Sequence, residues 1–215
     1  MRLVITAAAL ALGALGTGTA RAAPAAPSCP TGQLFATGNT AIITDPADPR
    51  LRTRLTRFEH EVRAIIAANG ARPGGSTLLD GVFWSADLKQ ATYERSREFD
   101  VNRVSRDGLH HLADVVAKQY HQESVLTFPC LPRNAPQAGA VEIQAPGVDS
   151  TRLHDALLAD PEARDELGGG STTLDGRLVL IAPVADLPLA QRFTRSLGVD
   201  WSRAEVRYSE EEFVR

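Results

Sequence analysis

The sequence is poor in cysteine, in lysine and in long apolar runs. It has 2 cysteines, and neither has a second Cys or a His at zinc-site spacing, so a zinc module is not expected. The net charge is −3 and no basic stripe is present, which argues against nucleic acid and anionic membranes as partners. The only lysines are Lys89 and Lys118; with abundant Ala, Gly, Asp and Pro, this Arg-based composition suggests a GC-rich bacterial coding sequence.

The sequence motifs that mark common catalytic sites are also absent. There is no Gly-x-Ser-x-Gly elbow, no phosphate loop ending in Gly-Lys-Ser/Thr and no dinucleotide-binding glycine fingerprint. His60-Glu61 begins a metalloprotease pattern, but Ala64 stands where the second His is required. The glycine runs at Gly74 and Gly169 follow predicted helices, which is typical of helix ends and turns and not of anion sites. These absences favour a non-catalytic protein.

The N-terminus has the pattern of a secretory signal peptide over residues 1–22. Arg2 is followed by the apolar run Leu3–Gly16 and by Ala20-Arg21-Ala22, a small-x-small cleavage pattern. The alternative, an uncleaved anchor, is disfavoured because the run is short and rich in Ala and Gly. We therefore expect a secreted protein with no membrane span after signal removal.

In an exported chain, Cys29 and Cys130 are most simply a disulfide. The bridge would close a loop of about 100 residues and contribute roughly 4 to 5 kcal/mol in the chain-entropy model. The alternative, a nucleophilic or metal-binding thiol, has no supporting neighbours in the sequence.

Hydrophobic periodicity predicts alternating helices and strands after a disordered tail at residues 23–33, which contains Cys29. We expect a hairpin within residues 34–44, a helix capped by Asp48-Pro49 that runs to Asn69-Gly70, a loop at residues 71–75 and a tight turn or bulge at Asp80-Gly81. Ser105 is expected to cap a later helix, and Asp149 or Ser150 another. A linker rich in Pro, Asn, Ala and Gly, residues 131–139, separates two halves, residues 34–130 and 140–215.

A short internal sequence repeat links these halves. Gly74–Gly81 and Gly169–Gly176 agree at all but one position, and each half reads strand, helix, one or two strands, helix, strand. This is the ferredoxin-like order. The chain therefore resembles the α+β barrels built from paired ferredoxin-like units: two tandem halves, each an antiparallel sheet with helices on one face, forming a barrel-like pseudo-dimer. The alternative is chance, since Gly, Ser and Asp are ordinary loop residues.

One helix gathers the weak catalytic candidates His110, Asp114 and His121. They share a flank at the rim of the apolar face, at about 100° per residue. His110 and His121 are separated by about 16 Å along the axis and cannot bind one metal ion together. The simpler interpretation is a solvated flank carrying an i,i+4 ion pair, so no metal site is predicted.

The strand near Tyr93–Val101 alternates between two faces. Arg95 and Arg97 lie on one face, and Glu94, Ser96, Glu98 and Asp100 on the other. If Arg95 and Arg97 were buried, they would need carboxylate partners or an anionic ligand, which makes them weak ligand-binding candidates. The favoured interpretation is a half-exposed strand near a sheet edge.

These observations favour an exported, non-catalytic protein that binds an unknown protein or small molecule. The alternative is a small ligand- or haem-binding enzyme that uses a ferredoxin-like barrel cavity, with His110 or His121 as axial ligand or acid–base group; haem or a metal ion is not excluded. A secreted protease inhibitor is disfavoured because the chain has only one expected disulfide and shows no evident rigid exposed loop.

Overall fold

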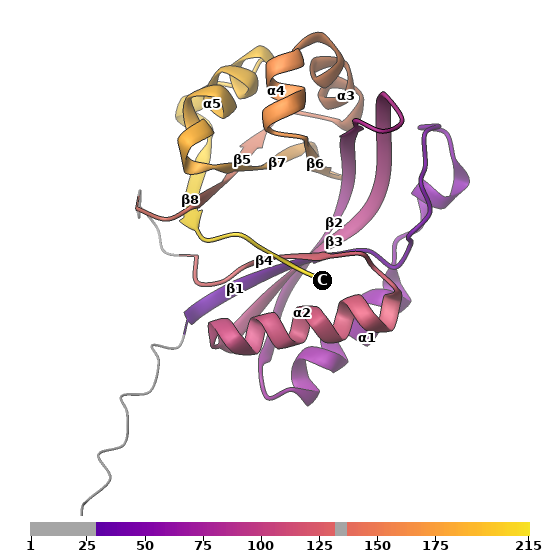
Figure 1. Cartoon of the computed structure of the whole chain (residues 1–215), viewed down its shortest axis with the longest axis vertical. Coiled ribbons are helices and arrows are strands. Elements are labelled where there is room, and N and C mark those ends of the chain that lie inside the picture. Colours follow the sequence, from indigo (N-terminus) through magenta and orange to yellow (C-terminus); the bar gives the residue numbers. More distant parts are fainter. Residues whose placement is uncertain (1–28, 132–136) are drawn as a thin grey trace, which may run out of the picture.

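The computed structural model describes residues 29–131 and 137–215, so the predicted signal peptide, most of the tail and part of the linker lie outside the described residues. Nine strands form one antiparallel sheet in the order β8-β5-β7-β6-β2-β3-β1-β4-β9. The sheet is curled, and helices α1 and α2 cover one outer side while α3, α4 and α5 cover the opposite side (Figure 1). The chain is therefore an α+β protein with its helices outside and its strands between them.

The strands alternate with helices along the chain. The strands are β1 Cys29–Ala36, β2 Arg72–Ser85, β3 Gln90–Val104, β4 Val125–Phe128, β5 Ala140–Pro146, β6 Gly169–Thr173, β7 Arg177–Pro183, β8 Glu205–Ser209 and β9 Glu212–Val214. The α-helices are α1 Thr56–Ala68, α2 Arg106–Tyr120, α3 Ser150–Ala159, α4 Pro161–Glu166 and α5 Leu187–Ser196. Short 3-10 helices span Pro49–Arg52, Val184–Asp186 and Trp201–Arg203. No helix in this part of the chain is both long and apolar enough to cross a membrane.

Local sequence signals set the helix ends. Ser105 caps α2 by accepting a hydrogen bond from the amide of Gly108, and the helix ends where His121 takes a left-handed φ of 53°. Asp149 and Asp160 cap α3 and α4 in the same way. Ser105 and Asp149 cap their helices where the sequence predicts a cap.

The sheet contains two groups of strands with the same internal order. Within β1 to β4 the order is β2-β3-β1-β4, and within β5 to β8 it is β6-β7-β5-β8. The groups join where β2 pairs with β6. The two repeated segments, Gly74–Gly81 and Gly169–Gly176, meet at this junction, since Gly81 pairs with Ser171 and Leu79 with Thr173.

The last strand connects the far ends of the sheet. β8 pairs with β5 at one end, and β9, which follows it in the chain, pairs with β4 at the other end. Because β8 and β9 follow one another in the chain but pair at opposite ends of the strand order, the sheet must curl back on itself.

Apolar side chains fill three clusters. One lies between α1, α2 and the sheet, around Leu34, Phe58 and Phe99. Another lies between α3, α4, α5 and the sheet, around Ile143, Leu153 and Phe193. The third, smaller cluster lies on the other face of the strands and contains Phe128, Leu131 and Ala140. The sheet thus buries apolar groups on both faces.

Residues 29–33 of the predicted disordered tail belong to β1, which pairs with β3. Three further local predictions are wrong. No hairpin forms within residues 34–44, because β1 pairs with β3 and β4 and leaves only a bridge from Ile43 to Tyr93. The helix predicted from Asp48 is interrupted: Asp48 caps a 3-10 helix, and α1 begins after Leu55, which has a φ of 50°. The carbonyl of Leu51 accepts a hydrogen bond from Arg95 Nε at 2.5 Å and is thus bonded outside the helix.

The third error concerns β2, which begins at Arg72 within the predicted loop and continues through Asp80-Gly81. These two residues pair with Arg95 and Glu94 instead of forming a turn. The irregularity lies earlier, between Pro73 and Ser76, and the chain reverses only at residues 86–89. Long ladder pairing on both sides of β2 overrides the local turn preference of Asp-Gly.

Candidate functional site

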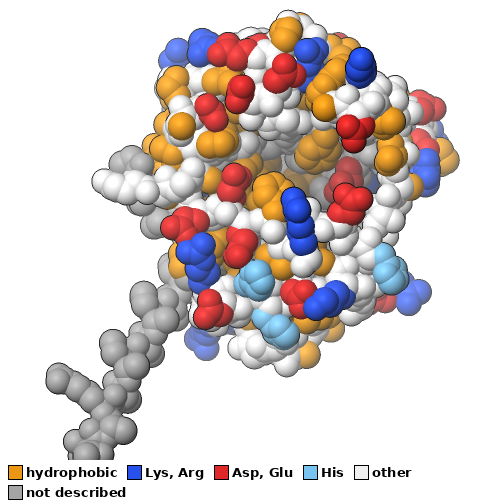
Figure 2. Space-filling model, in the orientation of Figure 1, with side chains coloured by type: hydrophobic (Ala, Val, Ile, Leu, Met, Phe, Trp, Pro, Cys, Tyr) orange, Lys and Arg blue, Asp and Glu red, His pale blue; other side chains and the backbone are white. Residues whose placement is uncertain are grey.

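The concave face of the curled sheet encloses a cavity of about 890 Å³. Residues directly opposite in an antiparallel pair point to the same face. Phe35 pairs with Leu126, and Leu126 with Phe213, and all three line the cavity. The space-filling view shows the surface hollowed between the two helix-covered sides, with acidic and basic side chains beside the hollow (Figure 2). The cavity is therefore formed by the sheet face that the helices do not cover.

Exposed apolar side chains gather at this cavity. Six large hydrophobic side chains of the described residues are exposed, and four of them, Ile42, Phe83, Leu88 and Phe213, line it. Scattered exposed hydrophobic residues are ordinary on a protein surface, whereas a contiguous apolar patch marks a binding site. The clustering singles out this concave face.

Glu94 is the most unusual polar residue of the cavity. It lies on β3 on the same face as Ser96, and both line the cavity. Burial raises the pKa of Glu94 to about 7, and no hydrogen bond or ion pair joins its side chain to the described residues. This carboxyl is therefore poised to hold or release a proton near neutral pH.

The remaining charges of the cavity are also acidic. Glu123, Glu166 and Glu211 line it together with Glu94, whereas no Lys or Arg of the described residues does. Burial also raises the pKa of Glu211. The cavity is thus apolar in its walls and negative in its charged groups.

Gln122 supplies a hydrogen-bond donor at the cavity. Its Oε1 accepts a hydrogen bond from the amide of Thr37 at 3.0 Å, which fixes the orientation of the side-chain amide. Its Nε2 is buried and has no partner among the described residues. The hydroxyl of Thr37 donates to the carbonyl of Arg95 at 2.8 Å, so the Gln122 amide lies beside the strand segment that carries Glu94.

A second group of carboxyls lies deeper on the same sheet face. Glu98 accepts a hydrogen bond from Gln33, and Glu142 forms an ion pair with Arg207 at 3.2 Å. Burial, and then the negative charge of Glu142, raises the pKa of Glu98 to about 8. Burial also raises the pKa of Glu142, which Arg207 opposes. Both carboxyls are buried with their own protein partners, so they do not line the cavity.

The structure separates the three helix candidates. His110 Nδ1 lies 2.9 Å from Glu212 Oε1, and Asp114 Oδ2 accepts from Lys118 Nζ at 2.8 Å, an i,i+4 pair on the helix surface. Only His121 lines the cavity, at its exposed rim. Among the residues described, no three His, Cys, Asp or Glu side chains are arranged to hold a metal ion.

Arg95 and Arg97 lie on the helix-facing side of β3, away from the cavity. Arg95 forms an ion pair with Asp80 at 2.7 Å, and Arg97 with Glu59 at 2.7 Å. The favoured edge-strand interpretation is wrong, because β3 is paired on both sides, with β1 and β2. Both guanidinium groups are thus paired with carboxylates of the chain itself.

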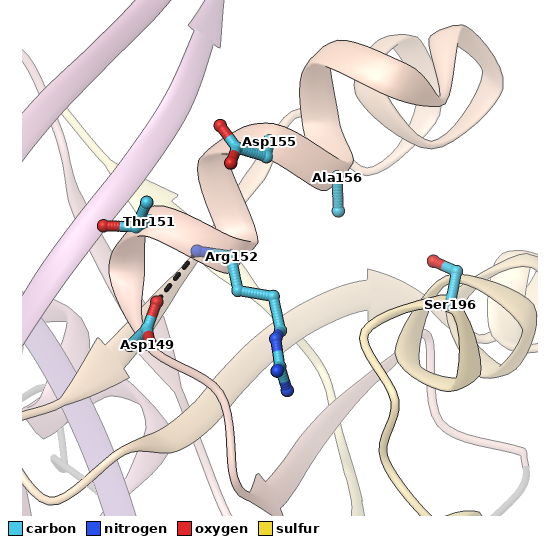
Figure 3. A pocket seen from close by; sticks show the side chains of 6 residues that line it. All are labelled: Asp149, Thr151, Arg152, Asp155, Ala156 and Ser196. Carbon is cyan, nitrogen blue, oxygen red and sulfur yellow. Dashed lines mark hydrogen bonds between the residues drawn. The ribbon is translucent and has the colours of Figure 1, made fainter.

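A smaller depression of about 500 Å³ lies on the outer surface beside α3 and α5 (Figure 3). Its polar groups serve the fold: Asp149 caps α3 by accepting from the backbone amide of Arg152, and the Arg152 guanidinium donates to the carbonyls of Gly147 and Leu197. With its charged groups engaged in this way, the depression is a helix-capping region and not a candidate site.

The charged groups of the cavity do not favour haem. A haem group carries two carboxylates, which proteins hold with cationic or hydrogen-bonding groups; the cavity has no Lys or Arg among the described residues, and Gln122 supplies its unpartnered donor. Of the two histidines expected as axial ligands, His110 is paired with Glu212 and lies outside the cavity.

The sequence pattern separates Glu94 and Ser96 from Arg95 and Arg97, but it does not show which face is enclosed. Alternation together with the expected barrel is the signal that points to Glu94. Gln122 follows α2 in a loop and carries no sequence signal at all.

Comparison with known proteins gives little further identification. No protein-family model matches the chain, and no curated protein matches it. One solved structure, described as that of a proposed monooxygenase from Lactobacillus acidophilus NCFM, is similar over 86% of this chain and 96% of the other, with 10% sequence identity and a TM-score of 0.26.

Proposed function

We propose that this protein binds a small, largely apolar ligand in the cavity on the concave face of its sheet. The observation that carries the proposal is the gathering of exposed Ile42, Phe83, Leu88 and Phe213 around one cavity. Its volume of about 890 Å³ lies in the range of small-molecule sites, roughly 300 to 1,000 Å³. Apolar walls with a few polar groups are the usual composition of such sites.

We favour binding over catalysis because the sequence has no catalytic motif. A second candidate function, proton transfer on the bound molecule, is supported by Glu94. A carboxyl whose pKa is raised to about 7 can act as a general acid or base near neutral pH. The site then needs a substrate whose reacting atom lies within hydrogen-bond reach of Glu94.

We also propose the finer architecture of two ferredoxin-like halves that form a barrel-like pseudo-dimer. The support is the shared order β2-β3-β1-β4 and β6-β7-β5-β8, together with the antiparallel pairing of the repeated segments where β2 meets β6. In such an arrangement the helix-free faces of two similar sheets oppose each other, which would create the cavity.

We also propose that the chain is exported and that Cys29 and Cys130 form a disulfide. The amide of Leu131 donates to the carbonyl of Thr31 at 3.1 Å, so the backbone brings the two cysteine positions into the same region. Intact-mass measurement of secreted protein tests both parts. We expect a chain that begins after Ala22 and that takes up an alkylating reagent only after reduction; a chain that begins at Met1, or alkylation without reduction, contradicts the proposal.

Titration with the neutral fluorophore Nile red tests ligand binding. We expect saturable one-to-one binding to the wild type and at least fivefold weaker binding to Ser171→Phe, because Ser171 lines the cavity and the larger side chain fills it. Phe213→Ala should also weaken binding, whereas Leu158→Ala, which removes an exposed apolar side chain elsewhere, should not. Absence of saturable binding, or equal affinity in Ser171→Phe, overturns the proposal.

A further inference from the structure

We infer that the cavity selects small apolar amines, with the ammonium group of the ligand paired to Glu94. This inference rests on the proposed function and specifies the ligand class of the same cavity. It depends on the charge of the cavity, on the lack of a protein partner for Glu94 and on the aromatic walls.

Charge favours a cation over an anion. The acidic residues that line the cavity are Glu94, Glu123, Glu166 and Glu211. No Lys or Arg of the described chain lines it, and His121 is the sole potentially cationic side chain there. An anionic ligand would be repelled by these four glutamates, whereas an ammonium group would be attracted to them.

Glu94 is the cavity carboxyl on a strand that lacks a counter-ion; Glu123, Glu166 and Glu211 also lack one in the described structure but lie outside the strands. The two buried carboxyls of the concave face have protein partners: Gln33 for Glu98, and Arg207 for Glu142. Glu94 has no such partner in the described structure. Burial alone raises its pKa, so an ammonium group beside it would supply the missing charge and favour the ionised carboxylate.

The walls suit an organic cation. Phe35, Phe83 and Phe213 line the cavity, and aromatic faces attract cations within about 6 Å of the ring centroid. The buried, unpartnered Nε2 of Gln122 offers a donor to an oxygen atom on the ligand. The ligand class is therefore an apolar amine, and an oxygen acceptor near the amine would add a further contact.

Three probes of matched shape test the inference: 2-phenylethylamine, 2-phenylethanol and phenylacetate. We expect calorimetric titration at pH 7.5 to give at least tenfold tighter binding of the amine than of the alcohol, and the weakest binding for phenylacetate. Glu94→Gln should remove the preference for the amine, while Glu162→Gln, at an exposed ion pair outside the cavity, should keep it.

Nile red separates failure of this inference from failure of the proposed function. If the wild type and Glu94→Gln bind Nile red but the amine binds no better than the alcohol, the cavity binds ligands and the inference is overturned. A preference that survives Glu94→Gln overturns the assignment to Glu94. If Glu94→Gln does not fold, as judged by lost Nile red binding and circular dichroism, Glu94→Leu serves as the second variant.

Discussion

Glu98 of β3 and Glu142 of β5 are far apart in sequence but interact inside the curled sheet, where the charge of Glu142 helps to hold Glu98 protonated. Each carboxyl has a neighbouring amide, from Gln33 and Gln144 respectively. Buried like charges cannot both ionise without cost, so the pair links the stability of the sheet to pH.

The first prediction is that stability falls as pH rises from about 5 to about 8. The pKa of Glu98 is raised from 4.5 to about 8 in the folded state, so its stabilising contribution is complete below the unfolded pKa and is lost as pH rises through the folded pKa. Glu98→Gln should flatten this dependence and be more stable than the wild type at pH 8. Urea unfolding at pH 5 and pH 8 measures it; an unchanged pH dependence in the variant contradicts the prediction.

A second prediction concerns the ion pair between Arg97 and Glu59, whose side chains are 10% and 25% exposed. Glu59→Gln should lower the free energy of unfolding by about 1 to 3 kcal/mol, because it leaves a largely buried guanidinium without its charge partner. The matched control is Glu162→Gln, whose partner Arg192 is exposed, with an expected loss under about 0.5 kcal/mol. Equal losses in urea unfolding would show that burial does not distinguish the two pairs.

The third prediction concerns Gly169, where β6 meets β2. Its φ is 157°, and an added Cβ would lie 2.7 Å from the backbone oxygen of Val82 and from Phe83. Gly169→Ala should therefore destabilise the protein by more than about 2 kcal/mol. At Gly139 an added Cβ meets nothing within 4 Å, so Gly139→Ala should change stability by less than about 1 kcal/mol. Thermal unfolding compares the two variants; an unchanged stability of Gly169→Ala would contradict the close packing of β6 against β2.

The fourth prediction tests the core beneath α1 and α2. Phe99 is fully buried and packs edge-to-face on Phe58, with ring centroids 5.9 Å apart. Phe99→Ala should cost about 3 to 5 kcal/mol, which includes the cavity it creates. Leu174→Ala removes a side chain that is 55% exposed and should cost less than about 1 kcal/mol. If Phe99→Ala lost little free energy of unfolding in chemical denaturation, Phe99 would not be a central core residue.

Local elements could be predicted where the signal is itself local. Ser105 and the apolar spacing of Leu109, Leu112 and Val116 predict α2, and the helix is present with those residues buried. The alternation of β3 predicts which side chains share a face, and the structure places Arg97 and Glu98 on opposite faces. These predictions succeed because capping and periodicity depend on neighbours in the chain.

The candidate site could not be predicted because it depends on pairing between distant segments. Nothing near Arg97 indicates that β3 lies between β1 and β2, so the local sequence wrongly favours an edge strand. The same pairing encloses Glu94, whereas alternation alone predicts a half-exposed face. The sequence does not predict β9, since Glu212–Val214 is short, begins with an acidic residue and becomes a strand only through pairing with Val125–Thr127.

The late position of β9 has a consequence for biosynthesis. During translation β4 is made long before Glu212–Val214, so the backbone groups along its edge stay available to other chains until β9 has been made. A variant that lacks Glu212–Val214 would keep this edge unpaired and open to strand pairing between molecules.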